Sequence, residues 1–161
     1  MKSFYYLLFT IFLFGCVTKE DNYLNKGLTE LKNHRVVNED LIDGITIKKF
    51  GIIKSEEKED EYKLVFLLNN DVKKEDVENY SVTIRAVPTD EEITMKRLEK
   101  KEFLWDFKPI LINKNEHNYI ITSVKTDIKK LKEIRFALYH RDGFQGKILS
   151  KIITVRNLSL Y

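Results

Sequence analysis

Residues 80–86 read YSVTIRA, with an apolar or aromatic residue at every second position. Successive side chains of a β-strand point to opposite faces, so Val82 and Ile84 share one face while Thr83 and Arg85 share the other. Pro88 closes the stretch, because proline cannot donate a hydrogen bond to a neighbouring strand. The pattern predicts a strand that is buried on one face and solvated on the other.

Similar patterns recur on both sides of this stretch. The segment 62–68 (YKLVFLL) is apolar enough to be a central strand covered on both faces. Asp-Gly and a second glycine within 141–146 predict a turn between the last two strands. No alternation of strands with helices is present, so a parallel sheet is not expected. In total the sequence predicts about seven strands, which lie at 45–53, 62–68, 80–86, 103–111, 119–124, 134–139 and 148–155.

One segment, 89–101, fits two structures. Thr89-Asp90-Glu91-Glu92 matches a capping box that would open a short helix through Lys101. Ile93 and Met95 also alternate with polar residues, as in a strand. Residues 72–79 are expected to form a loop with one helical turn.

The strand count, the short domain and the long connection Thr126–Glu133 before a strand that carries Tyr139 resemble immunoglobulin-like or fibronectin-type domains. The resemblance covers about residues 41–158 and implies an all-β fold, an antiparallel sandwich of two sheets. It also implies that Tyr139 could be the corner tyrosine of such folds, although an ordinary strand tyrosine fits the sequence equally well.

Composition limits the function. The chain has 161 residues, 28 Lys+Arg and 25 Asp+Glu, for a formal net charge of +3, and 43% of its residues are hydrophobic. This is a globular composition, and its near-balanced charge lacks the strong basic excess of a nucleic-acid-binding surface. The single cysteine excludes a disulfide framework within the chain.

The first sixteen residues are the most specific part of the sequence. Lys2 precedes an uncharged apolar run, 4–14, which is too short for a spanning helix but suits a secretory signal peptide. Leu13-Phe14-Gly15-Cys16 follows and resembles the lipobox of bacterial lipoproteins, with Phe14 larger than the usual residue. The resemblance implies cleavage before Cys16, acylation of Cys16 (diacylglycerol and palmitate-type chains) and attachment to the lipid bilayer.

The sequence therefore divides into a signal peptide (1–15), a lipidated tether (16–40) and a sandwich domain (41–161). Lys19-Glu20-Asp21 resembles the export tether of surface-exposed lipoproteins, and a solvated linker is the alternative. Val17 in place of aspartate favours the outer membrane, with the domain in the periplasm or on the surface. Leu24, Leu28 and Leu31 form a narrow apolar stripe on a short helix, which could contact the bilayer, bind a partner, dock on its own domain or remain a tether.

Motifs for chemistry are absent from the sequence. The three histidines are scattered, and no zinc spacing, nucleophile elbow or phosphate-binding glycine loop occurs. We therefore expect no catalytic residues, no metal and no cofactor. A hydrolytic enzyme that gathers carboxylates from distant strands is a less favoured alternative.

Two groups of residues are candidate contacts. Phe103, Trp105 and Phe107 share one strand face and would be a binding anchor if exposed or core if buried, while Phe144 lies at a turn tip. A candidate basic patch, which could face anionic lipid or polysaccharide or merely aid solubility, comprises Lys125, Lys129, Lys130 and Lys132. The sequence thus predicts a membrane-anchored, non-catalytic lipoprotein of the cell envelope with a binding or assembly role. The alternative is an accessory structural subunit of an envelope secretion or motility complex.

Overall fold

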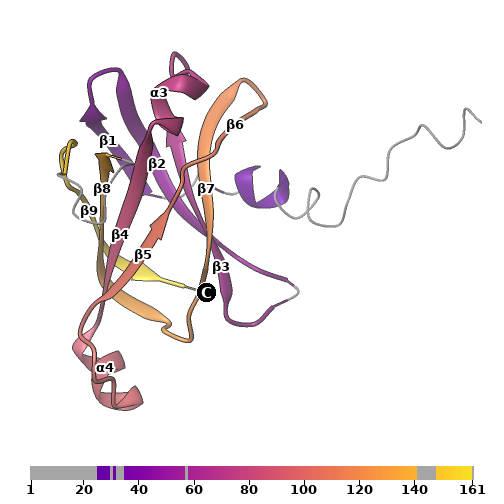
Figure 1. Cartoon of the computed structure of the whole chain (residues 1–161). Helices are drawn as coiled ribbons and strands as arrows, with labels where there is room; N and C mark the ends of the chain where they lie inside the picture. Colours follow the sequence, from indigo (N-terminus) through magenta and orange to yellow (C-terminus); the bar gives the residue numbers. More distant parts are fainter. Residues whose placement is uncertain (1–24, 30, 32–34, 57, 141–147, 161) are drawn as a thin grey trace, which may run out of the picture.

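A computed structural model describes residues 25–29, 31, 35–56, 58–140 and 148–160. Nine strands in these residues form two antiparallel sheets that face each other (Figure 1). We call them sheet A, with strand order β1-β2-β3-β7-β6, and sheet B, with strand order β5-β4-β8-β9. The predicted all-β sandwich is confirmed.

Sheet A contains five strands, β1 (Arg35–Ile42), β2 (Ile45–Lys54), β3 (Glu61–Leu68), β6 (Leu111–Lys114) and β7 (His117–Lys125). Sheet B contains four, β4 (Tyr80–Pro88), β5 (Phe103–Phe107), β8 (Lys130–His140) and β9 (Ile153–Ser159). Two labelled helices lie at opposite ends of the sandwich, α3 (Lys74–Glu78) and α4 (Asp90–Lys96) (Figure 1).

The strand order is that of an immunoglobulin-like domain. Strands β2-β3-β7-β6 correspond to A-B-E-D of such domains, and β4-β8-β9 correspond to C-F-G, with β5 in the place of C′. β1 is an additional strand before A. The chain crosses from one sheet to the other three times, after β3, after β5 and after β7. The domain is therefore a Greek-key sandwich rather than two consecutive meanders.

The core lies between the sheets and follows from the alternation of each strand. Val82, Ile84 and Ala86 of β4 are buried, as the pattern of 80–86 predicts, and Ile134, Phe136 and Leu138 of β8 are buried with them. β3 is the central strand of sheet A, and Val65 on its outer face is fully buried. The prediction of a central strand covered on both faces is therefore confirmed.

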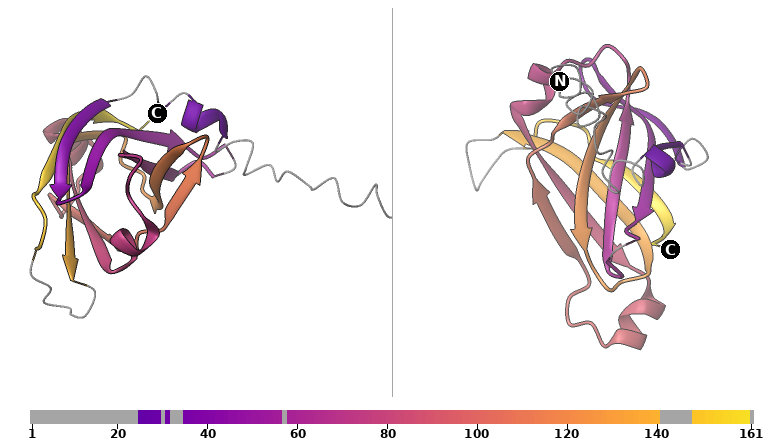
Figure 2. Two further views of the ribbon diagram at one scale, coloured as in Figure 1. Left: turned by 90° about the horizontal axis from the view of Figure 1, so that it is seen from above. Right: turned by 90° about the vertical axis from the view of Figure 1, so that its right-hand side faces the viewer.

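The outer cover of β3 is the segment before β1. Residues 25–29 are helical, and Leu28 and Leu31 pack on a second apolar cluster with Ile53, Val65 and Tyr119. Figure 2 shows this segment outside the two facing sheets. Of the alternatives for the leucine stripe, docking on its own domain is the one found for Leu28 and Leu31, while Leu24 lies outside the described residues.

Several predicted boundaries differ from the structure. The described residues contain nine strands rather than about seven, because β1 was not predicted and the single strand predicted at 103–111 is replaced by β5 and β6, which lie in different sheets. β1 begins at Arg35, within the range 16–40 assigned to a tether. The sequence pattern did not predict this strand, because the left-handed Asn38 and two register shifts interrupt its alternation. The connection predicted at Thr126–Glu133 is shorter, since β8 already begins at Lys130, which pairs with Ser159. The last strand begins at Ile153 rather than 148, with only an isolated bridge between Ile148 and Tyr139 before it.

The corner-tyrosine interpretation of Tyr139 is wrong on position. The corner tyrosine stands near the start of strand F, whereas Tyr139 is the penultimate residue of β8. It is an ordinary strand residue opposite Ser81.

The ambiguous segment 89–101 is a helix followed by a turn. The Thr89 hydroxyl accepts a hydrogen bond from the Glu92 amide at 3.2 Å, and Arg97 ends the helix in the left-handed conformation. The box is half formed, because the Glu92 carboxylate accepts instead from the Lys129 amide at 2.8 Å. This bond attaches the start of the helix to the connection that precedes β8.

Candidate functional site

The outer face of sheet A is a packing surface for the N-terminal segment. Leu28 and Leu31 are 4% and 1% exposed, and they cover Ile53, Val65 and Tyr119. Gly27 lies so close to Ile53 that a Cβ on it would stand 2.4 Å from the Ile53 Cδ1. Burial beneath the segment raises the pKa of Tyr119, because the phenolate would lose its hydration. This face is therefore occupied by the chain itself.

The α4 end of the sandwich holds a polar network. Glu92 is 2% exposed and lies 3.7 Å from Lys96, whose ammonium also reaches the Asp127 carboxylate at 3.0 Å. The hydrogen bond from Lys96 holds the pKa of Asp127 below its usual value. These contacts fix α4 to the β7–β8 connection, so the network has a structural explanation.

The four lysines of the predicted basic patch do not form one continuous surface, because they have different partners and lie on different sheets. The Lys129 ammonium donates to the buried Tyr62 hydroxyl at 3.0 Å and lies 3.5 Å from Asp60, and the bond to Tyr62 raises the pKa of Lys129. Lys130 pairs with Glu91 at 2.9 Å. Lys125 and Lys132 are exposed on different strands of different sheets. Acids interspersed with the lysines offset much of their charge.

The aromatic row of β5 points inward. Phe103, Trp105 and Phe107 are half-buried and pack against the core between the sheets. Of the two interpretations of this row, the structure has the core one. The intervening Asp106 is exposed and accepts a hydrogen bond from the Thr83 hydroxyl at 2.6 Å.

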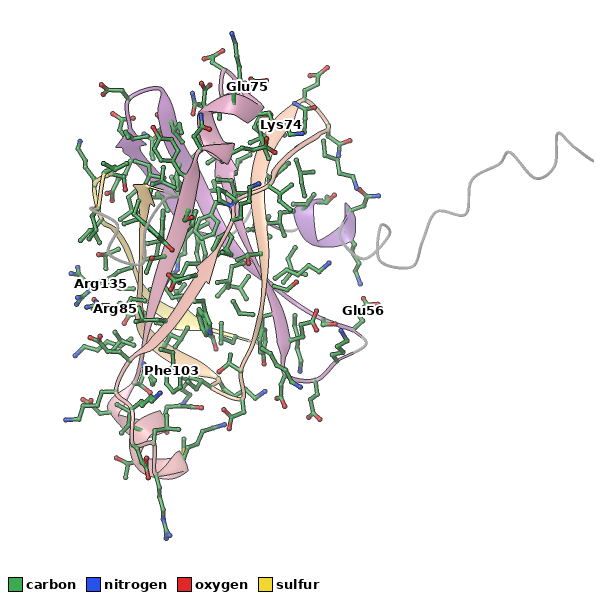
Figure 3. The ribbon with its side chains drawn as sticks, viewed as in Figure 1. Glu56, Lys74, Glu75, Arg85, Phe103 and Arg135 are labelled. Atoms are coloured by element: carbon green, nitrogen blue, oxygen red, sulfur yellow. The ribbon has the colours of Figure 1, made fainter. Side chains whose placement is uncertain are left out.

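The outer face of sheet B carries a group that sequence reasoning missed. Arg85 of β4 stands directly opposite Arg135 of β8 in the sheet register. Figure 3 shows both side chains extending from the same side of the sandwich into solvent. Alternation within 80–86 places Arg85 on the outer face, but only the strand pairing reveals that Arg135 faces it.

Acidic side chains partly neutralise the positive charge of the arginines on the outer face of sheet B. Glu133 is 7% exposed and contacts Arg135 on one oxygen, while its other oxygen lies 3.6 Å from Arg156 of β9. Glu102 lies 3.4 Å from Arg85. Arg85, Arg135 and Arg156 remain 46%, 42% and 74% exposed at their side chains.

The remaining predicted site residues lie outside the described residues. They are Leu13, Phe14, Gly15, Cys16, Lys19, Glu20, Asp21 and Phe144. Within the part of the chain that the structure describes, no three His, Cys, Asp or Glu side chains are grouped to hold a metal ion. No helix among the same residues is long and apolar enough to cross a membrane.

Comparison with known proteins yields no relative. No family model matches the chain, and neither does any curated protein or solved structure. The immunoglobulin-like description accordingly rests on the strand order, and function must be argued from the residues themselves.

Proposed function

We propose that the chain is a lipoprotein of the bacterial cell envelope, anchored in the outer membrane through acylated Cys16, with a non-catalytic sandwich domain that binds or assembles other envelope components. The observation that carries the proposal is the sequence 1–16, in which Leu13-Phe14-Gly15-Cys16 directly follows a short apolar run. Two or more acyl chains on one cysteine would make the attachment stable.

The docked segment fits a short anchor. Residues 17–24 separate Cys16 from the helical residues 25–29, and eight extended residues span at most about 29 Å. An anchor at Cys16 would therefore hold the sandwich near the bilayer. The segment that leads to the anchor packs on the outer face of sheet A. The outer face of sheet B is therefore on the opposite side of the sandwich from this segment.

Metabolic labelling with a clickable palmitate analogue tests the anchor. Wild type is expected to incorporate the label, and Cys16→Ser is expected to lose it and leave the membrane fraction. Lys2→Arg keeps the charge of the signal peptide and serves as the control that retains the label. Label retained by Cys16→Ser would reject the proposal.

Shaving of intact cells with protease, followed by pull-down from detergent, tests the binding role. Recovery of envelope proteins with wild type supports a binding or assembly function. Cleavage of the sandwich in intact cells would place it on the surface, and protection would place it in the periplasm. A labelled protein that never recovers a partner from cross-linked cells would contradict the binding role.

A further inference from the structure

A row of four residues crosses the outer face of sheet B, one from each strand. Arg85 pairs in register with Leu104 on one side and with Arg135 on the other, and Arg135 pairs with Thr154. We call Leu104, Arg85, Arg135 and Thr154 the cross-strand row. Leu104 is 58% exposed although it is aliphatic. From this row we infer that sheet B binds an acidic polypeptide segment, which names a partner class for the proposed binding role.

The two arginines at the centre of the row form an unfavourable pair within the isolated domain. Like charges directly opposite each other on neighbouring strands destabilise a sheet. Each arginine has one acidic partner, Glu102 beside Arg85 and Glu133 beside Arg135. Glu133 stands opposite Val87 in the register, two residues along β8 from Arg135, so it lies beside the pair along the strand direction. A carboxylate placed over the Arg85–Arg135 pair would relieve the repulsion that these flanking acids leave.

The choice of arginine suits a carboxylate ligand. Three of the six arginines of the chain (Arg85, Arg135 and Arg156) lie on this one face, whereas lysines supply most of the positive charge elsewhere. A planar guanidinium binds a carboxylate through two parallel hydrogen bonds, which a lysine ammonium cannot do. The acids Glu102, Glu133 and Asp106 balance the three arginines formally, so recognition would depend on short-range geometry more than on long-range attraction.

The exposed leucine distinguishes a polypeptide from an acidic polysaccharide. Leu104 lies next to Arg85 in the row and offers an aliphatic surface beside the guanidinium. A peptide can present an apolar side chain next to a carboxylate, whereas a polymer of uronic acids presents carboxylates without one. The row therefore fits an acidic segment with neighbouring apolar residues.

Fluorescence anisotropy with a labelled peptide of alternating Glu and Leu tests the inference on the full chain purified in detergent. We expect wild type to bind, and the Arg85→Gln/Arg135→Gln double variant to bind at least about tenfold more weakly. Arg85→Lys/Arg135→Lys should also weaken binding, because it keeps the positive charge but removes the two parallel hydrogen bonds that a guanidinium donates to a carboxylate. Lys26→Gln/Lys48→Gln changes the charge equally at exposed positions away from sheet B and should bind as wild type does.

Several results would overturn the inference. They are no binding by wild type, equal binding by the Arg85→Gln/Arg135→Gln variant, or equal binding of a peptide of alternating Gln and Leu. Arginine-dependent binding of alginate at equal affinity would assign the face to polysaccharide instead, and competition by inorganic phosphate alone would reduce it to a general anion site. The peptide-binding measurement does not depend on acylation of Cys16. Rejection of the lipid anchor and rejection of the peptide-binding inference can therefore be told apart.

A stability measurement checks the premise separately. If the opposed arginines are kept for binding at a cost to the fold, Arg85→Thr should raise the Tm of the unliganded protein by about 1–3 °C. Ser81→Thr, on the same face of β4, raises strand propensity without a change of charge and is the control for that effect. An unchanged or lower Tm for Arg85→Thr would contradict the premise of repulsion.

Discussion

Phe66 of β3 and Phe136 of β8 place their ring centroids 4.7 Å apart at an interplanar angle of 62°, edge to face across the two sheets. Both are 2% exposed, and Phe50 extends the contact at 5.1 Å from Phe66. β3 and β8 occupy the positions of strands B and F, which antibody domains join by a disulfide. In a chain with one cysteine, this aromatic pair connects the sheets where a disulfide stands in those domains.

The aromatic pair should be energetically coupled. Phe66→Leu and Phe136→Leu should each lower the free energy of unfolding by about 1–3 kcal/mol. The double variant should lose about 0.5–1.5 kcal/mol less than the sum, because the edge-to-face contact is lost only once. Urea denaturation of the four proteins measures the coupling. Ile53→Val belongs to the separate outer cluster and should add to Phe136→Leu without coupling; full additivity of the two phenylalanine changes would contradict the account.

Gly27 should be required for the docking of the N-terminal segment. Gly27→Ala favours a helix by about 1 kcal/mol, yet the new methyl would collide with the side chain of Ile53. We expect the collision to prevail, with a loss of about 1–3 kcal/mol in thermal unfolding and faster amide exchange over 25–29.

Two variants accompany the Gly27 measurement. Lys26→Ala is exposed and should leave both readouts near wild type. Ile53→Val removes the nearest carbon and should partly rescue Gly27→Ala. Stabilisation by Gly27→Ala alone would show that the segment does not pack on β2 as described.

Glu92 should contribute more to stability than its neighbour Glu91. Glu92→Ala leaves the partly buried Lys129 amide without its acceptor, which should cost about 1–3 kcal/mol. Glu91 is exposed and pairs with Lys130 on the surface, so Glu91→Ala should cost less than about 1 kcal/mol. Chemical denaturation compares the two, and equal losses would remove the structural role assigned to Glu92.

Alkaline pH should destabilise the domain. The folded-state pKa of Tyr119 is raised by burial, and that of Lys129 is raised by its bond to Tyr62. The stability linked to these two groups is complete below their unfolded values, about 10, and is lost as the pH rises through the folded values. Unfolding monitored from pH 8 upward should show this loss, and Tyr119→Phe should reduce its slope. An unchanged slope in Tyr119→Phe would mean that the phenol is not desolvated.

Local pattern was sufficient for much of the fold. Alternation in 80–86 identified β4, and the apolar run 62–68 identified the doubly covered β3. β1 was missed because its bulges and the left-handed Asn38 break the period of two. The conformation of 89–101 could not be chosen locally, since the group that holds the Glu92 carboxylate is the amide of Lys129, far along the chain.

The candidate site was less accessible to sequence reasoning. The aromatic row of β5 was visible, but whether it faced the core depended on which sheet edge it joined. The Arg85–Arg135 pair is a property of strand register, and neither local sequence contains the information that the other strand lies opposite. Surfaces formed across strands need the pairing before they can be recognised.

The most direct test of the lipoprotein account is mass spectrometry of the protein extracted from membranes and digested with trypsin. The account predicts an N-terminal peptide Cys16-Val17-Thr18-Lys19 that carries diacylglycerol and, on its amino group, a further acyl chain. A mature protein that begins at Met1, or an unmodified Cys16 within a longer peptide, would contradict the anchor and the location that depends on it.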